Sequence, residues 1–503
     1  MTHFKYSHFK LGALVTTLSL VGLALPALAY DSGSTGADGD FSPTVNTELQ
    51  IPESGVFNFT TVNIPTGVTV TFKKNTTNTP VVMLASGNVT IAGAINVSGG
   101  NSTHVGAAGD GNIGDDGVPG AGGPGGYSGG RGGLNGKVRG GMGLGPGGGG
   151  SGTQLGTTYW TSGGDITGGG GAGFATAGVY SQPNLPDAPY NNTGTGGPAY
   201  GSNELLPLIG GSGGGGGAGG LSFSGSGGGG GGGAILIASS GTVNVTGTIS
   251  ANGGASGSTA GDGLGATGGS GSGGAIRIVA TAIAGNGAIS AISGGVGGGA
   301  NVYTGSVQYR ATAGGTASVG RIRLEAETFT RTATSTPAHS FGSPSSVFVA
   351  GLPTLRITSV AGVAAPASPT GNADITLPST TPNPVTVEFA TTGVPVGNTV
   401  SLRVTPAYGA ATTVVSLAIT GTTAAGTTSV SATLPTGPSV LSASTTYTIV
   451  TAMGEALSIY AQGEVVEKVR LSTTMNGPTL ATLITKSGKE FEVPHAALAL
   501  IGS

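Results

Sequence analysis

Residues 81–100 read VVMLASGNVTIAGAINVSGG, and residues 234–254 read AILIASSGTVNVTGTISANGG. Both stretches consist of an apolar segment, a Ser-Gly corner, a V-x-[IV] segment, a glycine and an I-x-x-x-GG ending. A looser copy, AIRIVATAIAGNGAISAISGG, fills residues 275–295, and RIRLEAE at 321–327 resembles the start of a fourth. Apolar residues alternate with Thr, Asn, Ser and Ala in these copies, and this period of two is typical of β-strands. We therefore expect short strands separated by glycine corners.

The copies repeat the order of their segments as well as their pattern. Repeats of roughly 20–45 residues are typical of solenoids, in which stacked coils bury each other's apolar face. Residues 56–72, VFNFTTVNIPTGVTVTF, have the same alternation and would add one or two coils. We therefore expect a parallel β-solenoid, with an antiparallel sandwich as the alternative that would show similar alternation.

The VTIAG, VSGG and GGAILIAS pieces of these copies resemble the glycine-rich parallel β-helix proteins that Gram-negative bacteria export, some of which are adhesins. The resemblance covers about residues 41–330. It implies a right-handed β-helix and a location at the cell surface. The shared motifs are structural, so the resemblance implies no catalytic residue.

A second pattern separates the copies of the repeat. Residues 111–134, GNIGDDGVPGAGGPGGYSGGRGGL, have glycine at every third position. Collagen needs this spacing, but its chains are far richer in proline than this stretch. Polyglycine II also has three residues per turn, and its helices can bond sideways to one another. Because residues 213–217, 227–233 and 265–274 supply similar partners, we expect a bundle of polyglycine II segments. Mobile low-complexity loops are the alternative.

The totals and the N-terminus limit the classes of function. Of 503 residues, 104 are glycine, 8% are charged and none is cysteine, and the formal net charge of −3 excludes a strongly basic nucleic-acid surface. Residues 1–29 have a basic start, the apolar core LGALVTTLSLVGLALP and a small-x-small ending, which predicts a secretory signal peptide. No later run approaches the roughly 20 apolar residues of a membrane-spanning helix. We expect a secreted protein, extracellular or at the cell surface.

The C-terminal third has a different composition. Residues 351–452 are rich in Thr, Val, Ser and Ala and hold about seven alternating segments, which is typical of an immunoglobulin-like β-sandwich. Residues 453–503 regain charge and contain LATLITKSGKEFEVP, a hairpin pattern. The predicted organisation is all-β: signal peptide 1–29, glycine-rich β-solenoid with inserts 30–350, sandwich 351–452 and C-terminal hairpin tail 453–503.

The glycine-rich part offers two sets of candidate binding residues. Asp110, Asp115 and Asp116 lie in GDGNIGDDG, and short carboxylates separated by glycines occur in calcium loops. We expect solvated turn aspartates there, with a calcium site as the alternative.

Aromatic residues interrupt the same region, among them Tyr127, Tyr159 and Trp160. These rings either lock the bundle against the solenoid, which we expect, or stack on sugars.

No catalytic residue or other cofactor is indicated. Matches to G-x-S-x-G and G-x-G-x-x-G follow from the glycine content and lack the strand–turn–helix setting that gives those motifs meaning. The charges of Arg277, Arg321, Arg323 and Glu325 alternate with Ile and Leu, so we expect them on the outer face of an end coil.

These features predict a non-enzymatic structural or adhesive protein of the cell surface or extracellular matrix. Its partners would be polysaccharide, matrix or other cell-surface components, or further copies of the chain in a fibre. The first alternative is an ice- or carbohydrate-surface binder, which regularly spaced outward threonines would favour. The second is a polysaccharide-active β-helix enzyme, which a groove with two converging carboxylates would favour.

Overall fold

The computed structural model describes most of the chain after the predicted signal peptide, and residues 1–29 lie outside the described part. The described residues are 30–52, 54–103, 117–136, 138–153, 166–181, 194–220, 223–258, 265–297, 301–304, 307–310, 313–348, 351–366, 374–475, 479–493 and 495–501. The fold is mostly strand (37%) with almost no helix (4%), which confirms the expected all-β class. Among these residues, none of the helices has the length and apolarity to span a bilayer.

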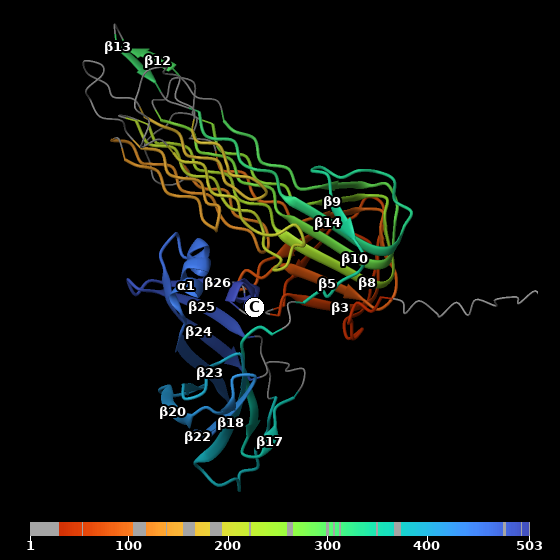
Figure 1. Cartoon of the computed structure of the whole chain (residues 1–503), viewed down its shortest axis with the longest axis vertical. Helices are drawn as coiled ribbons and strands as arrows, with labels where there is room; N and C mark the ends of the chain where they lie inside the picture. Colours follow the sequence, from red (N-terminus) through yellow and green to blue (C-terminus); the bar gives the residue numbers. More distant parts are fainter. Residues whose placement is uncertain are drawn as a thin grey trace, which may run out of the picture.

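Two parallel sheets form the first structural unit, and successive copies of the repeat contribute strands to both (Figure 1). The first sheet contains β1 (Gly39–Phe41), β3 (Val56–Ile64), β5 (Val81–Ala85), β6 (Val89–Ile91), β8 (Ala234–Val245), β10 (Ala275–Ala284), β14 (Arg321–Phe329) and β15 (Ser340–Gly342). The second contains β2 (Thr47–Gln50), β4 (Thr69–Lys73), β7 (Ala94–Asn96), β9 (Thr248–Ser250) and β11 (Ala288–Ser290).

Equivalent residues of the copies lie on top of one another. Ile237 of β8 pairs with Met83 of β5 and with Ile278 of β10, which in turn pairs with Leu324 of β14. Apolar columns of this kind from both sheets point inward and form one buried core. The β5 and β8 segments pair in parallel, so the antiparallel pairing held as the alternative is wrong for these strands.

A glycine bundle extends from one end of the two sheets (Figure 1). Its extended segments are residues 97–103, 117–123, 127–134, 138–144, 147–153, 166–173, 176–181, 194–200, 210–220, 224–233, 251–258, 265–274, 291–297 and 313–320. Several of them continue directly into strands, as residues 265–274 do into β10. The antiparallel pair β12 (Asn301–Thr304) and β13 (Val307–Arg310) lies at the end of the bundle remote from the sheets.

Two antiparallel sheets form the C-terminal unit. One contains β16 (Thr354–Val360), β17 (Val363–Ala364), β18 (Val385–Thr392), β21 (Thr420–Thr422) and β22 (Ala425–Ala432). The other contains β19 (Thr399–Pro406), β20 (Thr412–Ala418), β23 (Ser439–Thr448), β24 (Val466–Thr474), β25 (Leu480–Thr485) and β26 (Glu490–Val493). The short helices α1 (Thr451–Leu457), η1 (Ser458–Tyr460) and η2 (His495–Ile501) complete the unit.

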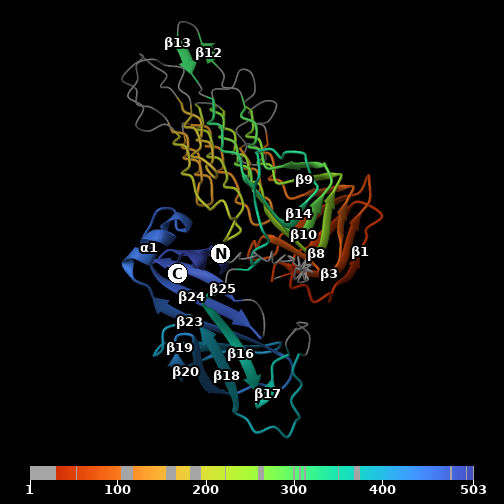
Figure 2. The same ribbon diagram turned by 45° about the vertical axis from the view of Figure 1, so that its right-hand side comes forward.

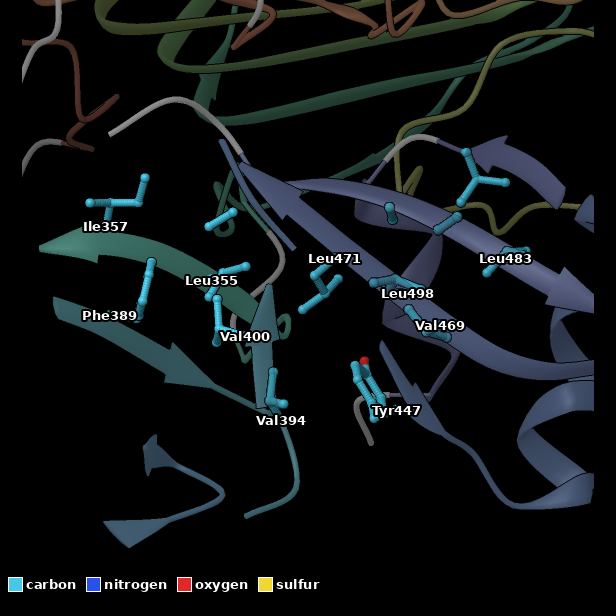
Figure 3. Close-up of a cluster of buried hydrophobic side chains, with 14 of the residues drawn as sticks. Leu355, Ile357, Phe389, Val394, Val400, Tyr447, Val469, Leu471, Leu483 and Leu498 are labelled. Atoms are coloured by element: carbon cyan, nitrogen blue, oxygen red, sulfur yellow. The ribbon is translucent and has the colours of Figure 1, made fainter. Parts of the chain in front are cut away.

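The two C-terminal sheets share a buried core that runs through residues 351–452 and 453–503 alike. Leu355 and Phe389 from one sheet lie opposite Val400 and Leu471 from the other (Figure 3). Strand β24 pairs with β23, so the residues of the predicted tail continue the second sheet. The β25–β26 hairpin turns where expected, with Gly488 at a φ of 82° in the left-handed region.

Candidate functional site

The glycine bundle is held together by backbone hydrogen bonds that repeat every third residue. In the segment 213–219, Gly213 donates to the carbonyl of Leu144, Gly216 to that of Gly141 and Gly219 to that of Val138, at 2.8–3.0 Å. The donors rise by three while the acceptors fall by three, so the two segments are antiparallel. Each segment therefore presents the same face to a given neighbour once every three residues.

The residues between these donors bond to other segments. Gly214 donates to Gly229, and Gly215 donates to Gly170 at 2.9 Å. The carbonyls of the segment 213–219 accept bonds from residues 130–133, 149–152 and 266–269. Three neighbours thus receive its bonds and three others donate to it, so the segment is surrounded by six.

This packing leaves no room for a side chain in the middle of the bundle. A Cβ atom at Gly215 would lie 2.0 Å from the carbonyl oxygen of Gly150, and one at Gly217 would lie 2.0 Å from that of Ala266. At the outer face the restriction ends, since a Cβ at Gly295 would meet only the Cβ of Ala255, at 3.9 Å. The nearly pure glycine segment 213–217 therefore lies where no side chain fits, whereas a side chain can be accommodated at the outer face.

The described part of the triplet stretch, residues 117–134, folds back on itself. Gly129 donates to Gly120 and Gly132 donates to Gly117, both at 2.9 Å. The chain reverses at Pro124-Gly125, where Gly125 has a φ of 72°. Residues 111–116 lie outside the described residues.

A loop after β4 holds this reversal against the sheets. The Lys74 Nζ and the Asn78 side-chain amide donate to the carbonyl of Gly126 at 3.2 and 2.9 Å, and the Asn78 carbonyl oxygen accepts the N–H of Gly125. Burial lowers the pKa of Lys74 to about 8. The loop after β4 and the bundle are thereby fastened through polar contacts.

The bundle and the C-terminal unit lie next to each other (Figure 2), and Tyr127 of the bundle packs where they meet. Its half-buried ring packs on the buried cluster that contains Tyr200 and Tyr460, and its hydroxyl is buried without a hydrogen-bond partner. Burial raises its pKa. The Tyr200 hydroxyl donates to the carbonyl of Gly210 at 2.6 Å and accepts from Ser212. These contacts give Tyr127 a packing role, but toward the C-terminal unit and not against the parallel sheets that the prediction named.

The remaining candidate residues lie outside the described part. Tyr159 and Trp160 fall within residues 154–165, and Asp110, Asp115 and Asp116 fall within residues 104–116. The calcium site therefore stays a prediction. Elsewhere, in the residues that the structure describes, no group of three His, Asp or Glu side chains is placed to hold a metal ion.

Arg277 and Glu325 alternate with the core residues Ile276, Ile278 and Leu324, so they lie on the outer side of the first sheet as expected, but that side is covered there. Their side chains are 1% exposed and form a two-point ion pair, with Arg277 Nε 3.1 Å from Glu325 Oε1. Ser345 covers the pair, donating both its N–H and its hydroxyl to Glu325. Burial would raise the pKa of Glu325, but bonds from Arg277, Ser345 and Arg323 outweigh it and hold the pKa below its ordinary value. Sequence reasoning missed the covering segment, which carries no recognisable signal.

One Ser–His contact deserves comparison with hydrolase chemistry. The Ser335 hydroxyl lies 3.1 Å from His339 Nδ1 but donates at 2.7 Å to the carbonyl of Pro337. Burial and the charge of Arg331 lower the pKa of His339. A nucleophilic serine needs its proton directed at the base and a third group that orients the base. Because the hydroxyl is directed at a carbonyl and the neighbouring charge is cationic, the pair fits a structural contact.

Comparison with known proteins gives no further guide to the site. The chain matches no protein-family model, no curated protein and no solved structure.

Proposed function

We propose that this chain is a secreted, non-enzymatic structural or adhesive protein of the cell surface or extracellular matrix. In this proposal the two parallel sheets are a β-solenoid, the glycine bundle is a polyglycine II bundle, and the C-terminal unit is an immunoglobulin-like sandwich. The observation that carries the proposal is the segment 213–219, whose backbone groups are bonded to six neighbours. Such packing stiffens a chain without using a reactive side chain.

Pairs of bundle segments are bonded to each other at the ends that the structure describes. Thr103 donates to Val118 at 3.2 Å, Thr167 to Thr153 at 2.9 Å, and Ser181 to Gly194 at 2.9 Å, so the described ends of successive segments meet in pairs. These paired ends border residues 104–116, 154–165 and 182–193 in the sequence. Binding and recognition residues are concentrated in loops held by rigid scaffolds.

Polysaccharide, matrix and other cell-surface components are the partners we propose. A test of this proposal replaces residues 154–165 by a Gly-Ser segment of equal length in the chain 30–503. Binding of this variant and of the parent chain to immobilised polysaccharides and matrix proteins is then compared. We expect lost binding with unchanged melting temperature, whereas Tyr408→Ser, on the C-terminal unit, should bind normally. Unchanged binding by the 154–165 variant, or no binding by the parent chain, would count against adhesion through these residues.

The alternative of an ice-binding face is not favoured. Its signature would be a regular row of outward threonines, but one outward row of the second sheet is Thr69, Ala94, Thr248 and Ala288. Alternating Thr and Ala give half the hydroxyl density that the alternative requires.

A further inference from the structure

The first parallel sheet ends in strands that are open on one side. β1 is the first strand of the sheet and β15 is the last, and β15 covers only Arg323, Leu324 and Glu325 of β14. Edge strands with free backbone groups are templates for pairing with another chain. A solenoid needs polar capping coils to prevent such pairing.

The last core layer is buried at the β15 end, but the aromatic side chain that follows it in the first sheet is uncovered. Phe341 pairs with Leu324 and extends the inward column of Ile278 and Ile237, yet Phe341 is 72% exposed whereas Leu324 is fully buried. Phe329 is also exposed, and its ring lies 6.3 Å from that of Phe341. A cluster of exposed aromatic side chains is typical of an interaction surface.

The β1 end offers apolar and charged groups of its own. Phe41 is half-buried and stacks on Phe59 with ring centres 5.2 Å apart, and Val45 is 68% exposed. Three exposed carboxylates lie in or next to β1 and β2, and no Lys or Arg occurs between residues 30 and 72: Asp38, Asp40 and Glu48.

The charge at the β15 end is of the opposite sign. Arg277 and Arg323 share the one buried carboxylate of Glu325. The Arg331 guanidinium donates only to backbone carbonyls, those of Gly285, Gly287 and Thr334. The exposed Glu327 on the flank of β14 offsets part of this positive charge.

We propose that the two ends are the halves of one interface, and that a second copy of this chain stacks its β1 end on the β15 end of the first. The parallel sheets would continue from copy to copy, and Phe341 would be covered. Because the two surfaces differ, the contact is heterologous and extends into a filament instead of closing as a dimer. The inference is independent of adhesion, since it needs no ligand.

The absence of cysteine makes the orientation testable. Ala37→Cys and Ala338→Cys each place one thiol on an exposed alanine, near the β1 and β15 ends respectively. Mixed under mild oxidation, the two variants of chain 30–503 should form disulfide-linked pairs, while neither variant alone should. Ala338→Cys linking to itself would indicate a two-fold contact and overturn the proposal.

Sedimentation velocity at rising concentration supplies the second measurement. We expect the parent chain to grow beyond the dimer, with growth weakened by salt. Phe341→Ser should weaken association at least tenfold, and Tyr408→Ser, which removes a 90% exposed ring from the C-terminal unit, should leave it unchanged. A parent chain that stays monomeric, or equal effects of the two substitutions, would refute head-to-tail stacking but leave the adhesive proposal intact.

Discussion

The two parallel sheets and the glycine bundle are built from the same continuous chain segments but exclude water in different ways. In β10, Ile276 and Ile278 fill a core between the sheets. A few residues earlier, Gly268 and Gly271 lie against the backbone of their neighbours with no side chain between. In one region side chains bury apolar area, and in the other hydrogen bonds and close backbone contact replace them. The same kind of substitution should therefore change the free energy of unfolding by different amounts in the sheets and in the bundle.

The largest effect is expected for an added methyl group in the middle of the bundle. Gly215→Ala places a Cβ 2.0 Å from the Gly150 oxygen, where only backbone atoms are available to move. We expect a loss of more than about 4 kcal/mol in the free energy of unfolding, or failure to fold. Denaturant unfolding checks the stability, and amide exchange of residues 210–219 checks the bundle.

Gly295→Ala is the matched control for this prediction. Its added Cβ lies 3.9 Å from its nearest neighbour, so the stability should change by less than about 0.5 kcal/mol. Equal tolerance at both positions would contradict the close packing of the segments.

The second prediction concerns the buried ion pair on the outer side of the sheets. Glu325→Gln leaves the Arg277 guanidinium buried without a countercharge, which should cost about 3–5 kcal/mol. Glu327→Gln, two residues further along the same strand and exposed, should be nearly neutral. Thermal unfolding of both variants tests the pair, and similar melting temperatures would mean that Arg277 is solvated.

The third prediction compares one residue type in the two regions. Ile278→Ala opens a cavity between the sheets and should cost about 2–5 kcal/mol. Ile292→Ala, on a bundle segment where the side chain is 41% exposed, should cost less than about 1 kcal/mol. Denaturant midpoints measure both, and comparable losses would show that the bundle depends on apolar burial after all.

The smallest effect is a pH dependence at the loop that joins the regions. Because the pKa of Lys74 is about 8 in the folded chain and 10.5 ordinarily, the unfolded chain holds more protons between these values. Stability should therefore rise with pH over that range, by up to about 2 kcal/mol. Burial raises the pKa of Tyr30 to about 12, so stability should fall above about pH 10. Unfolding of the parent and Lys74→Met at stepwise pH tests this, and a rise that persists in the variant would exclude Lys74.

The strand pairing was predictable from sequence because stacked copies place like residues together. The V-x-[IV] segments at 89–91 and 243–245, which occupy the same place in the two copies of the repeat, are paired in the structure. The period of two fixed which residues point inward, and the glycine corners fixed where each strand ends.

The partners inside the bundle were not predictable. The three-residue phase shows which positions face a neighbour, but Gly215 bonds to Gly170 and Gly150 packs against it without any side chain to mark either contact. The Arg277–Glu325 pair was missed for a related reason: alternation with apolar residues places both charges on the outer side of the sheet, but it does not show that the segment at Ser345 covers them.

The direct passage of bundle segments into strands has a mechanical consequence. A pull on the remote end of the bundle would be carried along many chain segments at once, each bonded sideways to its neighbours, and on into β8, β10 and β14. Bonds that lie across the direction of pulling are loaded in shear and must break together, whereas bonds along it would open one after another. The junction between the two regions therefore distributes tension over several chain segments instead of concentrating it on one.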